Sequence, residues 1–362
     1  MLLSLDGPDN YDTAHMTTTG KWTNVGQSYG PFTTPTATPT IQTTGGRLGK
    51  GCLRFDGTST NAPNNGWAGI ALTPGDNRGS AGFWWKASAW PSSRLTFFMV
   101  YDATTPQLSL CVEGGHLVVM RGSRSGTQLA YTNWTLATGA DHYYELMWVI
   151  HNTAGLIDLQ IDGASVPLYA VGSGALLNGV PTLNTRNSAN SSWNILYYNI
   201  DNSAQVGGQW FFRDFYRCDG VGGLSFLGDV VVSRLPRLTD GNYTMYTPSA
   251  AGSHSALVDE APATDDTDYI ESVTPGDKDS GNYTIPAGTL AVVFDAYGRK
   301  TDATVRGFHA FRRSGTTDYP FGSDQILSTS YQYFGNNLVL PTDPATGLPW
   351  VAGTAELGVT TV

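Results

Sequence analysis

Large apolar residues recur at every second position in many short stretches of this chain, and glycine-rich turns separate those stretches. Residues 144–150 place Tyr, Leu, Trp and Ile at alternate positions, and residues 157–161 alternate Ile, Leu and Ile with Asp and Gln. The turn sequence at 152–155 lies between them. Because successive side chains of a strand point to opposite faces, this alternation predicts a β-hairpin with one buried face.

The same pattern returns along the chain. Residues 108–112 and 117–120 alternate around Gly114-Gly115, a two-residue turn signal, and further strands are predicted at 83–87 and 210–218. No run of ten residues has apolar positions at helical spacing. Only 14% of the residues are charged, against roughly 25% in a typical domain. The sequence therefore predicts an all-β protein.

The length of 362 residues suggests two domains. The turn residues Val221-Gly222-Gly223 follow the strand 210–218, so we expect domains at 1–222 and 223–362, with a strand at Phe226–Leu235 opening the second. Further strands of the second domain are predicted at 290–295, 305–312 and 328–334 and after Trp350. Its long acidic loop, 248–281, is of a length that is often functional or held by a partner.

Three segments together resemble the concanavalin-A-like lectin/glucanase sandwich of the laminin-G type. They are the glycine-rich entry into a strand at 46–57, the strand–turn–strand unit at 142–163 and the late strand at 210–219. The resemblance implies a jelly-roll sandwich for residues 1–222, followed by a second β-sandwich-like domain.

The whole chain also resembles a class of tailed-bacteriophage virion proteins. The resemblance rests on the opening Asp6-Gly7…Tyr11-Asp12, on 226–232, on 259–269 and on the ending 343–350. It implies a minor virion component on the tail or an appendage. Together with the low-charge surface and the lack of catalytic and export signals described below, it leads us to expect a structural, adhesive protein at the tail or tail tip, with other virion proteins as partners, a homo-oligomeric state and cell-surface glycan as a ligand. The alternative is a capsid decoration or scaffolding protein without a ligand, and head versus tail stays open.

The net charge and the first residues of the chain indicate which partners and which cellular location to expect. A net charge of −10 without any basic run argues against nucleic-acid binding, and no apolar stretch approaches the ~20 residues of a membrane span. The first residues have no basic segment before an apolar run, so no signal peptide is expected. We expect synthesis in the host cytoplasm and incorporation into the virion.

Catalytic signatures are missing. The glycan hydrolases of this superfamily use paired carboxylates on alternate positions of a strand, but none of the five Glu starts such a motif. Asp158 and Asp162 have a related spacing around Gln160, which a solvated strand face explains better. We expect no catalytic residues and no enzyme activity, with a glycan hydrolase as the less favoured alternative.

Metal and disulfide signals are weak. The six His lack metal-ligand spacing, and the odd number of Cys argues against a disulfide framework, although pairing of Cys52 with Cys218 stays open. The acidic run 265–268 could bind Ca²⁺, as could Asp56 or Asp76, but a solvated turn is the simpler interpretation. No cofactor is expected.

The binding signal is aromatic. Trp193 lies in an Asn/Ser-rich stretch, 184–199, that ends in Tyr197-Tyr198. Sugars stack on flat aromatic faces while amides and carboxylates contact their hydroxyl groups, so these three residues are the predicted ligand-binding residues. The alternative is a loop that its one Trp anchors to the core.

Overall fold

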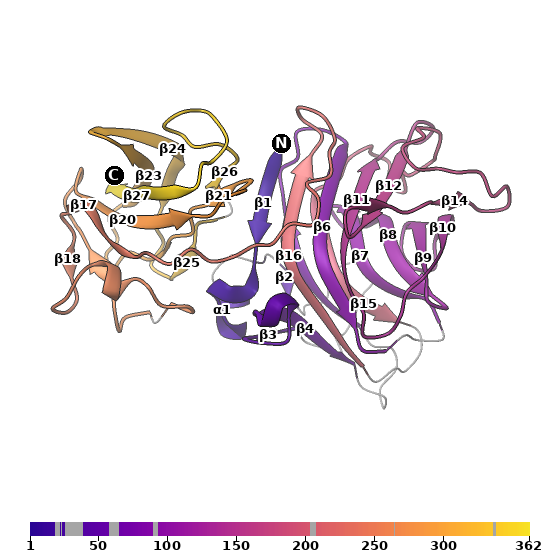
Figure 1. Cartoon of the computed structure of the whole chain (residues 1–362), viewed down its shortest axis with the longest axis horizontal. Helices are drawn as coiled ribbons and strands as arrows, with labels where there is room; N and C mark the ends of the chain where they lie inside the picture. The colour runs from indigo at the N-terminus through magenta and orange to yellow at the C-terminus, as the bar shows by residue number, and fades with distance from the viewer. Residues whose placement is uncertain are drawn as a thin grey trace. The chain divides into compact units, whose positions relative to one another are not determined.

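The computed structural model describes residues 1–18, 22, 24–25, 39–57, 65–89, 93–202, 208–263, 265–335 and 338–362. Over these residues the chain forms antiparallel sheets (Figure 1), which confirms the all-β prediction. The longest helix of the described part is α1 (Thr13–Thr18). No described helix has the length and hydropathy needed to cross a membrane.

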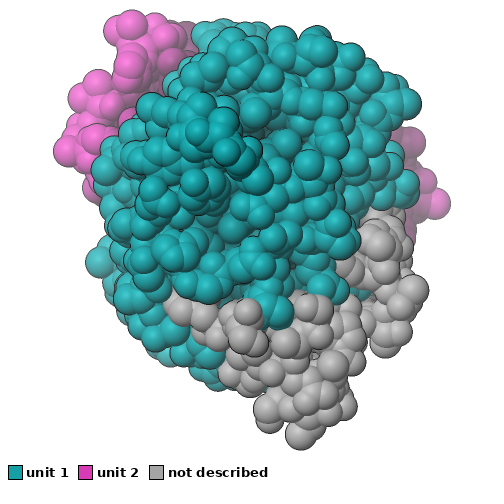
Figure 2. Space-filling view, turned by 90° about the vertical axis from the view of Figure 1, so that its right-hand side faces the viewer, with its two compact units in different colours: residues 1–8, 22–232 teal, residues 9–21, 233–362 magenta. Residues whose placement is uncertain are grey.

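The chain divides into two compact units. Unit 1 comprises Met1–Pro8 and Trp22–Val232 (teal in Figure 2), and unit 2 comprises Asp9–Lys21 and Ser233–Val362. The boundary lies ten residues after the expected one, and a segment near the start of the chain belongs to unit 2.

Unit 1 contains two eight-stranded sheets. The first sheet runs in the order β13 (Ala164–Ser165), β12 (Leu156–Ile161), β11 (Asp141–Val149), β6 (Arg78–Ala87), β16 (Gly208–Asp219), β4 (Cys52–Gly57), β3 (Thr40–Gln42), with β1 (Leu2–Asp6) also on β16. The second runs β14 (Tyr169–Ala170), β10 (Thr127–Thr135), β9 (His116–Arg121), β8 (Thr105–Glu113), β7 (Leu95–Asp102), β15 (Ile195–Asn202), β5 (Asn65–Ala71), β2 (Asn24–Val25).

Aromatic rings join the facing sides of the two sheets. Phe83 of β6 stacks on Phe98 of β7, with ring centroids 5.3 Å apart, and meets Tyr198 of β15 edge-on at 5.2 Å. Trp85 stacks on Phe97 with centroids 3.9 Å apart. Aromatic pairs add stability beyond the area that they bury, so these rings fix how the sheets pack.

The predicted hairpins are confirmed. Strands β11 and β12 pair in the register Leu146 to Leu159 and Trp148 to Ile157, and these side chains are buried. Strands β8 and β9 are joined by Gly114 and Gly115, whose φ angles of 58° and 82° favour glycine.

Residues 225–232 form a cover segment on the outward face of the first sheet, where a new strand was predicted. This segment has no regular secondary structure. Its Gly228 N–H donates to Glu145 (2.8 Å), its Val232 N–H donates to Asp214 (2.9 Å), and Leu227 packs on a cluster that includes Trp84. The Gly222–Gly223 turn therefore precedes a segment of unit 1 and does not separate the units.

The three cysteines are buried and none of them forms a disulfide, so the possible Cys52–Cys218 bridge is not present. Burial raises the pKa of the Cys218 thiol to about 11. The Cys111 thiol donates to or accepts from Thr96 inside unit 1. All three behave as small apolar residues.

Unit 2 is built on a five-stranded sheet in the order β17 (Thr239–Thr244), β20 (Lys278–Ile285), β27 (Gly353–Thr361), β23 (Gly307–Ser314), β24 (Thr317–Ile326). Three two-stranded sheets accompany it: β18 (Thr247–Pro248) with β19 (Ile270–Glu271), β21 (Val292–Val293) with β26 (Val339–Leu340), and β22 (Tyr297–Gly298) with β25 (Gln332–Tyr333). Its core includes Phe308, Leu338 and Trp350.

The early segment 9–18 is held in unit 2 by ring contacts. Tyr11 is buried and meets Tyr333 edge-on at 6.2 Å, and His15 meets Tyr297 at 5.7 Å. These partners lie more than 280 positions away in the sequence, which explains why the alternation pattern could not assign this segment.

We predict that Glu145→Gln stabilises unit 1 at pH 8, because it removes the charge of a buried carboxylate. Burial raises the pKa of Glu145, and hydrogen bonds from Tyr216 and Gly228 offset only part of that rise. Both bonds reach Oε1, whereas Oε2 is buried without a partner among the described residues. Because the folded state holds this proton more tightly than the unfolded chain, wild-type stability falls as pH rises through the folded pKa, and the Gln variant avoids that loss.

Differential scanning calorimetry between pH 4 and pH 8 measures this effect. The gain should vanish at the acidic end, where Glu145 is protonated. Glu113→Gln is the matched control, since Glu113 is half exposed and pairs with Arg94 at the surface. A lower melting temperature for Glu145→Gln than for the wild type at pH 8 would contradict the prediction.

Candidate functional site

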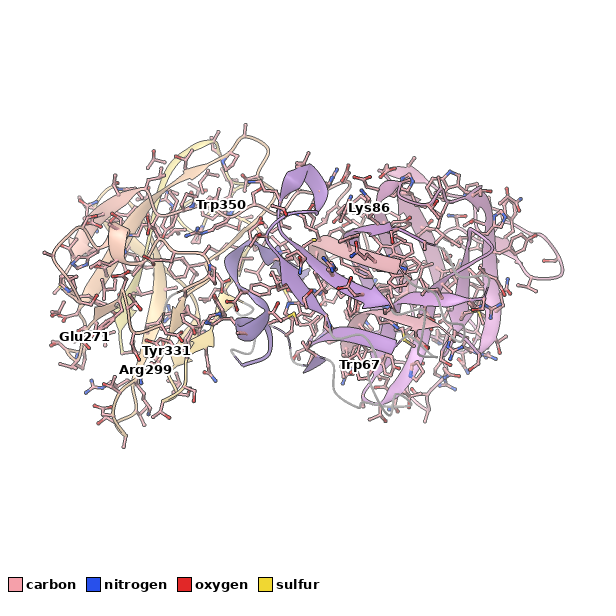
Figure 3. The ribbon with its side chains drawn as sticks, turned by 90° about the horizontal axis from the view of Figure 1, so that it is seen from below. Trp67, Lys86, Glu271, Arg299, Tyr331 and Trp350 are labelled. Atoms are coloured by element: carbon pink, nitrogen blue, oxygen red, sulfur yellow. The ribbon has the colours of Figure 1, made fainter. Side chains whose placement is uncertain are left out.

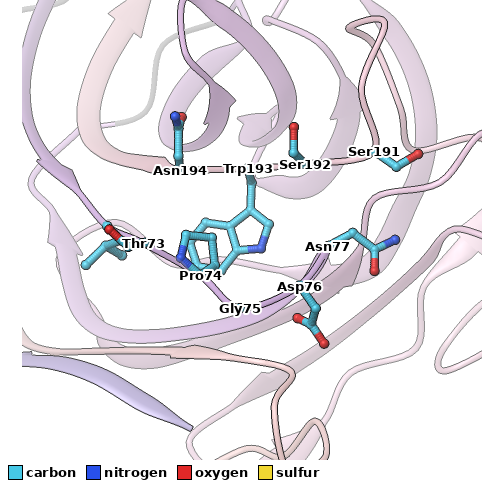
Figure 4. Close-up of a pocket in the computed structure, with 10 residues that line it drawn as sticks. Thr73, Pro74, Gly75, Asp76, Asn77, Ser191, Ser192, Trp193 and Asn194 are labelled. Carbon is cyan, nitrogen blue, oxygen red and sulfur yellow. The ribbon is translucent and has the colours of Figure 1, made fainter.

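An open pocket of about 540 Å³ lies at one end of unit 1. One wall is the turn 72–77 between β5 and β6, and the other is the segment 191–194 that leads into β15 (Figure 4). Loops at the end of a sandwich are common places for binding sites.

Backbone hydrogen bonds hold the two walls together. The Leu72 N–H donates to the Asn194 carbonyl at 2.8 Å, and the Asn194 N–H donates to the Tyr101 carbonyl at 2.8 Å. The first of these bonds joins the walls directly, and the second ties segment 191–194 to β7. The two walls are thus fixed to each other and to β7 by backbone hydrogen bonds.

Polar side chains, one of them buried, hold the turn 72–77 in place. The Gly75 N–H donates to the buried Asp219 carboxylate at 2.9 Å, and the Asn77 side-chain amide donates to the Ile150 carbonyl at 2.7 Å. Asp76 accepts from the Arg78 guanidinium at 2.6 Å. This wall is fixed by contacts that need no ligand.

Trp193 anchors the opposite wall. Only 1% of its surface is exposed, its indole N–H donates to the Arg78 carbonyl at 3.1 Å, and its ring meets Trp148 edge-on at 5.1 Å. Gly79 makes this packing possible, because a Cβ there would lie 2.5 Å from Trp148 and 2.7 Å from Trp193. This burial is the geometry that the anchoring alternative predicts for Trp193.

Several polar side-chain groups of the lining residues have no hydrogen-bond partner among the described residues. The hydroxyl groups of Thr73 and Ser191 make no hydrogen bond with described residues, and the same is true of Asn77 Oδ1 and Asn194 Nδ2. Among the described residues that line the pocket, Asp76 is the only charged one, and it is paired with Arg78. Donors and acceptors without net charge suit a hydroxyl-rich, uncharged ligand.

The structure does not bring the three predicted ligand-binding residues together. Tyr197 and Tyr198 are successive residues of β15 and point to opposite faces of the second sheet. Tyr198 is in the core with Phe83, whereas Tyr197 lies on the outward face, 4.9 Å from the Tyr101 ring. Both are buried, at 0% and 4% exposure, so neither offers an open ring face. Of the three predicted residues, Trp193 is the one that lines the pocket.

The sequence pattern missed the turn 72–77. Its letters, Thr-Pro-Gly-Asp-Asn, indicate a turn, but nothing local reveals that it lies beside a segment about 120 positions later. Asn194 and Ser191 fall inside the predicted polar stretch 184–199, and both line the pocket.

The carboxylates considered for catalysis have structural partners. Asp158 accepts from the Asn178 amide at 2.7 Å. Asp162 accepts from the Tyr143 N–H at 2.8 Å and contacts His142 at 2.7 Å. These bonds hold the two carboxylates in the strand and turn that carry them, and neither lines the pocket.

The acidic run 265–268 is held by unit 2 itself. Asp266 accepts from Arg299 at 2.8 Å and from the Tyr331 hydroxyl at 2.7 Å, and Figure 3 shows these two partners side by side. Asp265 accepts from the Tyr297 hydroxyl at 2.5 Å. The structure therefore gives Asp265 and Asp266 partners within the same chain.

No metal centre is visible in the described part of the chain, where no group of three or more His, Cys, Asp or Glu could hold an ion. The other two Ca²⁺ candidates, Asp56 and Asp76, form ion pairs with Arg54 and Arg78 at 2.8 Å and 2.6 Å.

Comparisons with known proteins give distant likenesses. No family model and no curated protein matches the chain. A cellulose induced protein has a TM-score of 0.42 and 16% identity, over 54% of this chain and 90% of that one. The binding domain of botulinum neurotoxin DC in complex with rat synaptotagmin II has a TM-score of 0.35 and 12% identity, over 89% and 87%.

A carbohydrate esterase of the Shiga toxin-encoding bacteriophage phi24B also has a TM-score of 0.35, with 11% identity over 60% of this chain and all of that one. These TM-scores are below 0.5 and the identities below 25%, so the likenesses carry no inference about family, ligand or activity.

We predict that Gly79→Ala destabilises unit 1 by about 1–3 kcal/mol, because the new methyl group would overlap the Trp148 and Trp193 rings. Thermal unfolding and near-ultraviolet circular dichroism, which reports tryptophan packing, measure the change. Gly298→Ala is the control, since a Cβ there would meet only Leu327 at an ordinary 3.8 Å. Wild-type stability and an unchanged spectrum for Gly79→Ala would show that the position of Trp193 in the wall 191–194 does not depend on this packing.

Proposed function

We propose that this chain is a non-enzymatic adhesive protein of a phage virion, associated with the tail or tail tip. Its end pocket binds a neutral sugar unit of a cell-surface glycan. The observation that carries the proposal is the pocket between 72–77 and 191–194, which is preformed, lined by unused hydroxyl and amide groups and free of unpaired charge. The virion location and the homo-oligomeric state rest on the sequence resemblance.

The proposal of binding without catalysis is supported by how the acidic residues are used. Asp76 and Asp219 fix the turn 72–77, and Asp158 and Asp162 fix a strand and a turn. Each serves as a hydrogen-bond acceptor for its own chain. General acid–base cleavage of a glycan needs two carboxyl groups facing the substrate, and the part of the lining that the structure describes has one carboxylate, the ion-paired Asp76.

We predict that the purified chain binds neutral glycans on an array and that pocket variants weaken this binding. Thr73→Val and Ser191→Ala each remove one hydroxyl group and should each lower the affinity about 2–10-fold, the range of a single neutral hydrogen bond. Ser191→Trp should abolish binding by filling the pocket. Isothermal titration calorimetry with the best array glycan measures these changes.

Thr138→Val, at an exposed turn between β10 and β11, is the matched control and should bind as the wild type does. Equal affinity for Thr73→Val, Ser191→Trp and the wild type would place the ligand elsewhere. An array without any bound glycan, together with stoichiometric incorporation into particles, would favour the decoration protein without a ligand. Hydrolysis of an array glycan would overturn the non-enzymatic proposal.

A further inference from the structure

One fully buried side chain, that of Gln107, forms hydrogen bonds with the segment 187–192, which directly precedes Trp193. Gln107, on β8, is 0% exposed, and its Oε1 accepts the backbone N–H groups of Asn187 at 2.6 Å and Ser188 at 3.1 Å. Its Nε2 donates to the Ser188 hydroxyl at 2.7 Å and to the carbonyls of Asn190 at 3.1 Å and Ser192 at 3.0 Å.

These five contacts replace regular secondary structure. Residues 186–194 form no strand with a neighbour, so their backbone groups need other partners. Asp102 adds to the same arrangement, because it accepts from the hydroxyl groups of Ser188 at 2.7 Å and Ser192 at 2.9 Å. Two side chains of the second sheet, Gln107 and Asp102, therefore hold the segment by hydrogen bonds.

We infer that Gln107 is a positioning residue for the pocket: it holds residues 187–192, which lead into and overlap the wall 191–194, in the conformation that receives the ligand. This inference rests on the proposed function. Ser191 and Ser192 line the pocket, and both lie within the stretch that Gln107 binds. Gln107 itself is not a lining residue, so it acts through the wall.

The physical reason is the entropy of ordering the wall. A segment without a ladder of strand hydrogen bonds samples many backbone conformations, and a ligand that binds it must select one of them. Fixing even one residue costs enough free energy to change an affinity about tenfold. By ordering the wall before binding, Gln107 removes that cost.

Gln107→Glu tests the inference, because it keeps the shape and the Oε1 acceptor but turns the donating amide into a carboxylate oxygen that faces two carbonyls and a hydroxyl group. At pH 8 the wall should loosen. At pH 5 the introduced carboxyl, whose pKa burial raises, should be protonated and regain one donor. A purely structural role would let the exchange at this wall change with pH but would leave the affinity for the ligand unchanged, so the two are measured together.

Hydrogen–deuterium exchange of 187–192 and calorimetry with methyl β-glucoside and methyl β-galactoside are measured at pH 8 and pH 5, with exchange rates corrected for pH. For Gln107→Glu at pH 8 we expect exchange at least about tenfold faster and affinity about tenfold weaker, with both recovering at pH 5. The wild type, and the control Gln160→Glu on the half-buried face of β12, should show neither change.

Unchanged exchange at 187–192 in Gln107→Glu at pH 8 would overturn the inference, as would faster exchange with unchanged affinity. Gln107→Met, which lacks all five contacts but buries no charge, should loosen the wall at both pH values and decides the matter if the Glu variant does not fold. If the wild type binds neither glycoside, the exchange data still decide whether Gln107 orders the wall, and that result counts against the proposed function alone.

Discussion

The packing of Phe83 between the two sheets of unit 1 is the contact on which the rest of that unit depends. Its ring meets Phe97, Phe98, Tyr144, Tyr198 and Phe212, which come from strands of both sheets. Four residues earlier on the same strand, Gly79 leaves room for Trp148 and Trp193. The strand that carries Phe83 therefore also carries the glycine against which Trp193 packs. Because Trp193 belongs to segment 191–194, this packing places that segment beside the turn 72–77.

Local patterns predicted the strands because alternation and turn chemistry act over a few residues. The hairpin β11–β12 and the glycine turn between β8 and β9 were predicted for that reason. Longer-range contacts decided the rest. The cover segment looked like a strand, but Glu145 and Asp214 bind its backbone N–H groups and hold it on the outward face of the first sheet.

The candidate site shows the same division. Composition pointed to the polar stretch around Trp193, and the structure places Trp193 at the pocket. Alternation along β15 separates Tyr197 from Tyr198, a result that strand geometry makes unavoidable once the segment is a strand. Local patterns could not predict the roles of the opposing turn and of the buried Gln107. The turn lies beside residues 191–194, and Gln107 binds Asn187 and Ser188, which are 80 and 81 positions away in the sequence. Buried polar side chains acting as internal clamps also account for the walls, which need no bound ligand to keep their form.

The central claim is that the pocket beside Trp193 binds a neutral sugar. Nuclear magnetic resonance of protein labelled with ¹⁵N at its ten tryptophans tests it most directly. On titration with methyl β-glucoside or methyl β-galactoside, the indole signal that Trp193→Phe removes should shift, and the others should stay in place. Absence of any shift at saturating glycoside, or a shift confined to another tryptophan such as Trp67 on the outward face of the second sheet, would contradict the account.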